Sequence, residues 1–173
     1  ITIQSIFDGS KEIKVLHKDD LCLTPVINTK RTKIYCEYDG TIIEYDIINE
    51  KRRELTSSPA MDYYPVISPD DKYLCWLSEG VVQLFDIENY KEVDLFSNGC
   101  EEFGSDPSCI SGRPRWSQDS NNIVTSNGNG IIVINVRNNQ IKQLTNDNGQ
   151  YPVFSAKGDT VVYVTTYKSK NFP

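Results

Sequence analysis

Residues 63–77 read YYPVISPDDKYLCWL: one apolar segment, a Ser-Pro-Asp-Asp sequence and a second apolar segment. Proline and aspartate favour turns and are depleted in strand interiors. The stretch therefore predicts two antiparallel strands joined by a tight turn at residues 68–71. An isolated hairpin is only marginally stable in water, so the fold depends on whether this unit recurs along the chain.

The unit does recur. Residues 65–87, PVISPDDKYLCWLSEGVVQLFDI, align without a gap with residues 25–47, PVINTKRTKIYCEYDGTIIEYDI. Residues 114–136 form a third copy, and residues 152–164 match the first half of the unit. Residues 1–16 resemble the second half of the third copy. The chain therefore contains full and half units with a period of about 40 residues, which is typical of repeat folds.

Each full unit contains several short segments rich in Val, Ile, Tyr, Phe and Leu, separated by turn-forming residues. In the second copy these segments are residues 64–67, 72–78, 80–87 and 91–96. No segment shows a sustained helical period. Trp76 and Trp116 lie in the predicted strands and are expected to be core aromatic residues. Four strands in each unit of about 40 residues predict the blades of a β-propeller, an all-β fold.

We predict a single β-propeller domain over residues 1–173. Its parts are a half blade at 1–16, full blades at 23–56, 64–96 and 113–145, a loop insertion at 97–112 and a half blade at 151–165. The two half blades are complementary, so we expect a closed four-bladed ring in which the termini share one blade. An arc cut from a larger propeller is the alternative, and the absence of an initiating Met before Ile1 is in keeping with it.

The composition excludes several classes of protein. Hydrophobic residues make up 38% of the chain and charged residues 24%, which is typical of a globular protein. No apolar run approaches the roughly 20 residues that span a bilayer, so we expect no membrane insertion. The net charge of −6 disfavours nucleic acid as a partner.

The chain has 5 cysteines. Cys36 and Cys75 lie in apolar segments and are interpreted as buried small hydrophobic residues. Cys100 and Cys109 bracket the sequence CEEFGSDPSC and are a candidate disulfide in an oxidising compartment. No Cys-x-x-Cys pair occurs, so we expect no metal site of the usual zinc spacing.

The repeat resembles that of the TolB-type, WD-like β-propellers, which also occurs in the propellers of prolyl-oligopeptidase-like proteins. The resemblance rests on a residue and Pro before the first strand, Ser-Pro-Asp in the turn, and a later apolar strand that ends in Asp. It covers almost the whole chain, although Asn28-Thr29-Lys30 and Gln118 depart from the pattern. It implies a periplasmic or extracellular location and a protein partner.

The first strand of each propeller blade lines the central channel, so the residue before each repeated proline is expected near one rim. These residues are Thr24, Tyr64, Arg113 and Tyr151. Together with Tyr63 and Arg115, the tyrosines and arginines form a candidate ligand-binding rim, because such side chains stack on ligands and bind anions. The alternative is structural: the tyrosines pack between blades and Arg115 pairs with a neighbouring carboxylate.

The loop insertion at 97–112 is the main irregularity in the repeat, and long loops on regular scaffolds often carry recognition. Its candidate partner-binding residues are Glu101, Glu102, Phe103 and Asp106. A purely decorative loop is the alternative. Calcium binding by this loop or by the turn at residues 145–149 is a weaker hypothesis, since Asn-Asp-Gly turns form without metal.

Catalysis has little support in the sequence. His17 is the single histidine, and no nucleophile elbow, metalloprotease or phosphate-binding motif occurs. We therefore expect a non-catalytic propeller, without a cofactor, that binds a protein or peptide through its channel rim. The alternatives are a propeller domain or fragment of a larger peptidase-like enzyme and a carbohydrate-binding, lectin-like propeller.

Overall fold

The computed structural model describes residues 2–3, 14–15, 21–57, 61–93 and 100–165. All regular secondary structure in these ranges is β-strand. The chain divides into two compact units, Ile1–Pro65 and Val66–Pro173.

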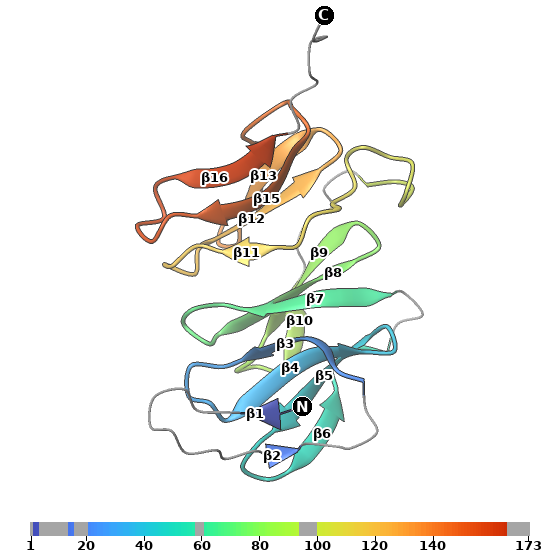
Figure 1. Ribbon diagram of the computed structural model, residues 1–173, viewed down its shortest axis with the longest axis vertical. Coiled ribbons are helices and arrows are strands. Elements are labelled where there is room, and N and C mark those ends of the chain that lie inside the picture. Colours follow the sequence, from blue (N-terminus) through green and yellow to red (C-terminus); the bar gives the residue numbers. More distant parts are fainter. Residues whose placement is uncertain (1, 4–13, 16–20, 58–60, 94–99, 166–173) are drawn as a thin grey trace, which may run out of the picture. The chain divides into compact units, whose positions relative to one another are not determined.

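The first unit contains a short two-stranded sheet and one four-stranded antiparallel sheet (Figure 1). The short sheet pairs β1 (Thr2–Ile3) with β2 (Lys14–Val15). The larger sheet follows the chain order through β3 (Leu23–Ile27), β4 (Lys33–Tyr38), β5 (Thr41–Asp46) and β6 (Lys51–Glu54). Successive strands are therefore joined by short turns, as expected for a blade.

The second unit repeats this arrangement. Its first sheet contains β8 (Tyr73–Ser78), β9 (Val81–Asp86) and β10 (Lys91–Val93), and the edge strand β7 (Asp62–Ile67) includes the border between the two units. Its second sheet contains β11 (Arg115–Trp116), β12 (Asn122–Asn127), β13 (Gly130–Asn135) and β14 (Gln140–Gln143). β15 (Gly149–Phe154) and β16 (Val161–Thr165) form a two-stranded sheet.

The core of each sheet is made by its second and third strands, which carry the most apolar sequence. In the first unit, Ile34 and Cys36 of β4 pack with Ile43 and Tyr45 of β5. In the second unit, Trp76 of β8 is only 1% exposed. The sequence-based interpretation of Trp76 as a core aromatic is confirmed.

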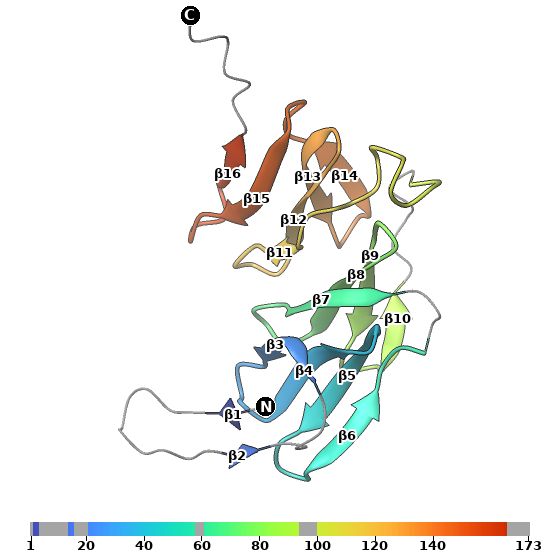
Figure 2. The same cartoon turned by 45° about the vertical axis from the view of Figure 1, so that its right-hand side comes forward.

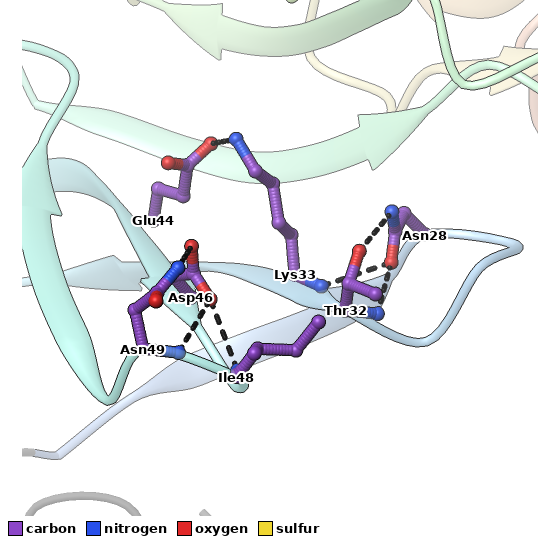
Figure 3. Close-up of polar contacts among 7 residues, drawn as sticks. All are labelled: Asn28, Thr32, Lys33, Glu44, Asp46, Ile48 and Asn49. Atoms are coloured by element: carbon purple, nitrogen blue, oxygen red, sulfur yellow. Dashed lines mark hydrogen bonds and ion pairs between the residues drawn. The ribbon is translucent and has the colours of Figure 1, made fainter.

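The turn between the first and second strands is closed by a buried polar side chain. In the second and third blades, Ser68 and Ser117 accept hydrogen bonds of 2.9 Å from the backbone N–H of Tyr73 and Asn122. In the first blade, Asn28 takes this role, and its Oδ1 accepts from the Lys33 N–H at 2.9 Å (Figure 3). The departure from Ser in the first repeat therefore preserves the turn.

The Asp or Asn that ends each third strand closes the next turn. Asp46 accepts hydrogen bonds from the N–H groups of Ile48 and Asn49 (Figure 3). Asp86 and Asn135 accept equivalent bonds in the other two full blades. Short polar side chains that bond to the backbone a few residues on favour such turns, which explains why Asp or Asn recurs at this position.

The prediction of an all-β fold built from four-stranded units of about 40 residues is confirmed. Each segment expected to be a strand in the second copy overlaps one of the observed strands β7 to β10. Closure of a four-bladed ring, and the grouping of all residues into one domain, stay predictions. The candidate strand end at 94–96 lies outside the described residues.

Cys36 is buried, as expected, but it is not an unpaired hydrophobic residue. Cys36 forms a disulfide with Cys22, and their Cα atoms lie 5.6 Å apart. Cys22 directly precedes β3 and Cys36 lies in β4, so the bond links neighbouring strands. The apolar surroundings of Cys36 hid its partner from sequence reasoning. Cys75 is a free, buried cysteine, as expected.

Candidate functional site

The residue before the repeated proline has an unusual backbone conformation. Thr24, Tyr64 and Tyr151 have φ angles of 46°, 60° and 55°. Left-handed φ is uncommon for residues other than glycine and is disfavoured before proline. In β3 and β15 the strand register shifts across this position. Strain of this kind costs about 1–3 kcal/mol per residue and clusters at functional sites.

The first unit contains two of the candidate rim residues. Tyr63 and Tyr64 are half-buried, and their rings meet edge to face with centroids 5.2 Å apart. The backbone of Tyr64 also hydrogen-bonds to the carboxylate of Glu37. Burial raises the pKa of Glu37, and this hydrogen bond offsets only part of the rise. The two tyrosines therefore belong to a packed local cluster.

The other three candidate residues belong to the second unit, on or next to two strands that contact each other. β11 and β15 lie side by side, as both views show (Figures 1 and 2). Arg115 lies on β11, Arg113 directly precedes Pro114 and this strand, and Tyr151 lies on β15. The side chain of Tyr151 is 76% exposed.

Arg115 is half-buried and lies near a like charge. Burial lowers its pKa, and the positive charge of Arg113 lowers it further. Within the described part of the chain, no carboxylate forms an ion pair with Arg115. The structural alternative of a neighbouring carboxylate partner is therefore not what these residues show. A common rim that joins these residues to Tyr63 and Tyr64 of the first unit stays a prediction.

The loop at residues 100–112 is held in place by several contacts. Cys100 and Cys109 form a disulfide with Cα atoms 4.5 Å apart. The Ile110 N–H donates to the Gly80 carbonyl at 2.8 Å, and the Gly128 N–H donates to the Pro107 carbonyl at 2.9 Å. The loop is thus fixed to the β8–β9 and β12–β13 hairpins. Sequence reasoning missed the role of Gly80, whose turn position gave no sign of this contact.

The candidate partner-binding residues of this loop differ in their surroundings. Asp106 accepts hydrogen bonds from the N–H groups of Glu101 and Ser108, and these bonds hold the pKa of its carboxyl group below the usual value. Glu102 accepts from the Ser105 hydroxyl at 2.7 Å. Glu101, Glu102 and Phe103 are exposed, and Phe103 is 52% exposed. Asp106 therefore stabilises the loop, and the other three are available at its surface.

Among the described residues, no group of three or more His, Cys, Asp or Glu side chains is placed to hold a metal ion. His17 lies outside the described residues. In the same part of the chain, no helix is long and apolar enough to cross a membrane.

No protein-family model matches the chain, and no curated protein matches it. Solved structures do match. An oligogalacturonate lyase from Vibrio parahaemolyticus aligns with a TM-score of 0.68 and 12% identity over 87% of this chain and 49% of its own. TolB from Acinetobacter baumannii aligns with a TM-score of 0.63 and 18% identity over 88% of this chain and 39% of its own.

The fold is that of a β-propeller. A third structure, U3-55K, aligns with a TM-score of 0.60 and 17% identity over 75% of this chain. The expected likeness to TolB therefore holds for the fold. The chain spans 39% to 49% of the length of these structures, and identities this low carry no information about activity.

Proposed function

We propose that the chain is a non-catalytic propeller module that binds a protein or peptide through the ends of the first strands of its blades. The observation that carries the proposal is Tyr151, a large aromatic side chain that is 76% exposed on a backbone with φ of 55°. Such backbone strain persists only where the surrounding structure enforces it. Thr24 and Tyr64 share this conformation, so it recurs at three of the four equivalent positions.

The chemistry of the residues supports a peptide ligand. Tyrosine and arginine are enriched among the residues that dominate protein–protein binding energy. Tyr151 offers an apolar ring with a polar hydroxyl, and the neighbouring β11 offers Arg113 and Arg115.

An extracellular or periplasmic location is part of the proposal. Two disulfides, Cys22–Cys36 and Cys100–Cys109, support it, since disulfides persist in oxidising compartments and are rare in the cytosol. The absence of catalysis is also proposed, because the sequence carries no recognisable catalytic motif.

Selection from a displayed library of random peptides, followed by calorimetry with the enriched peptide, tests this function. We expect Tyr151→Ala to weaken binding about tenfold or more, as loss of an aromatic hot spot does. Ile48→Ala is the matched control, because Ile48 is an exposed apolar residue in a turn of the first unit. Failure to enrich any peptide, or equal binding by Tyr151→Ala and the wild type, would contradict the proposal.

A further inference from the structure

We infer that Arg113 and Arg115 form a binding site for a carboxylate group, and that the ligand is an acidic peptide whose chain passes over Tyr151. The inference rests on the proposed function and deepens it by naming the class of ligand. It is argued from the second unit alone, where the three residues lie on or next to the neighbouring strands β11 and β15.

Arg115 differs from the residues at the equivalent position of the other repeats. The residue after the repeated proline is Val26, Val66 or Val153 in the other copies. The same strand can therefore form with an apolar side chain at this position, and the sheet does not need a charge there. Arginine at this place in the third copy is unexplained by the fold.

The arrangement of charge around Arg115 also favours an anionic ligand. Two guanidinium groups repel each other, and partial burial strengthens the repulsion because the effective dielectric constant is lower there. Arg115 experiences both burial and the charge of Arg113. Arginine stays protonated in proteins, so an anion bound at Arg115 would reduce the electrostatic cost of burying this charge.

Other cationic side chains of the chain form ion pairs with carboxylates. Lys33 pairs with Glu44 at 3.0 Å, and Arg52 pairs with Glu54 at 3.2 Å. For Arg115, the described residues supply no carboxylate. A carboxylate from outside the chain would complete the site with the bidentate geometry that guanidinium groups favour.

The net charge of the chain limits which class of anionic ligand can bind. A net charge of −6 repels a long polyanion such as a nucleic acid. A short peptide with one or two Asp or Glu side chains carries little charge, so the local attraction of two arginines outweighs the repulsion. The exposed ring of Tyr151 supplies the apolar contact that a peptide side chain needs.

Calorimetry of the full chain at low ionic strength tests the site. The first two probes are the peptide selected for the proposed function and the same peptide with its Asp and Glu residues changed to Asn and Gln. The third is trigalacturonate, which carries carboxylates but is not a peptide. We expect the acidic peptide to bind, its amide counterpart to bind at least about tenfold more weakly, and Arg115→Gln to remove most of this preference. The control is Arg137→Gln, because Arg137 is exposed in the turn after β13.

The outcomes distinguish failure of the carboxylate site from failure of the proposed peptide-binding function. A peptide that binds the wild type and Arg115→Gln equally would overturn the carboxylate site and leave peptide binding intact. An equal loss in Arg137→Gln would show nonspecific charge attraction and would also overturn the site. Binding of trigalacturonate that depends on Arg115, without peptide binding, would support the carboxylate site and overturn the proposed peptide function.

Discussion

The indole N–H of Trp116 donates a hydrogen bond of 3.0 Å to the backbone carbonyl of Val66, 50 residues earlier in the chain. The ring of Trp116 also stacks near that of Tyr73, with centroids 6.4 Å apart. Within the second unit, Trp116 thus ties the first strand of one blade to the preceding blade. Sequence reasoning placed it among the core aromatics, but its side chain is half-buried and bonds between the sheets.

Trp116→Phe should destabilise the protein while preserving the fold. The substitution removes the donor to Val66 and leaves its carbonyl without this bond, which costs about 0.5–1.5 kcal/mol. Urea unfolding followed by circular dichroism measures the change. Trp116→Leu should cost more, because it also removes the aromatic contact with Tyr73. An unchanged free energy of unfolding in Trp116→Phe would show that this bond does not stabilise the fold.

Gly80→Ala tests whether the loop at 100–112 is packed onto the β8–β9 hairpin. An added Cβ would lie 2.8 Å from the Cβ of Cys109 and 2.9 Å from the Sγ of Cys100, on a backbone with φ of 81°. We expect a larger loss of stability than from left-handed strain alone, which costs about 1–2 kcal/mol.

Gly158→Ala is the matched control for that experiment. Gly158 has φ of 74° and nothing within 4 Å of its added Cβ, so it reports the strain without the steric overlap. Faster hydrogen exchange at Ile110 should accompany Gly80→Ala only. Equal effects of the two substitutions on unfolding and exchange would contradict the packed loop.

The cysteines should behave as two disulfides and one inaccessible thiol. Peptide mapping without reduction should show Cys22 linked to Cys36 and Cys100 linked to Cys109. Cys75 should resist thiol reagents until the protein unfolds, because it is fully buried and burial raises its pKa. Detection of a different pairing, or rapid labelling of Cys75 in the native state, would contradict the structure.

The Cys22–Cys36 bond should stabilise the chain substantially. A disulfide that closes a loop of about 15 residues contributes about 3 kcal/mol in the chain-entropy model. We expect Cys22→Ser with Cys36→Ser to lower the free energy of unfolding by about 2–4 kcal/mol. The same urea titration measures the change. As a control, Cys100 and Cys109 are replaced by Ser in both proteins, and under reducing conditions the protein that keeps Cys22 and Cys36 should then be as stable as the one that lacks them.

Asp119 should make stability depend on acid pH. A hydrogen bond from Ser117 and another from the Asn121 N–H lower the pKa of Asp119 in the folded state. Its contribution is therefore complete above the unfolded pKa of about 3.9 and is lost as pH falls through the lower folded value. Asp119→Asn should be less stable than the wild type at pH 7, and the difference should shrink below about pH 4. A difference that is constant with pH would contradict this assignment.

The repeat made much of the fold predictable from the sequence. Strand positions follow from short apolar segments, and the turn residues Ser68 and Asp86 bond to the backbone as their residue types predict. Contacts between distant turns could not be predicted, because they depend on how the sheets pack. Gly80 under the Cys100–Cys109 loop is one example, and the bond from Trp116 to Val66 is another.

The candidate site was predictable by position but not by conformation. The register of the repeat identified Tyr64, Arg113 and Tyr151 as equivalent residues. It could not foresee the left-handed backbone at Tyr64 and Tyr151, because both precede proline, where this conformation is disfavoured. The sequence also could not predict which side chains surround Arg115, because its pairing depends on side chains from other strands.

A crystal structure of the chain with its selected peptide tests the central claim most directly. The account predicts a peptide that contacts the Tyr151 ring and places a carboxylate against the guanidinium groups of Arg113 and Arg115. A peptide bound elsewhere, for example on the exposed Phe103 of the 100–112 loop, with β11 and β15 uncovered, would contradict it.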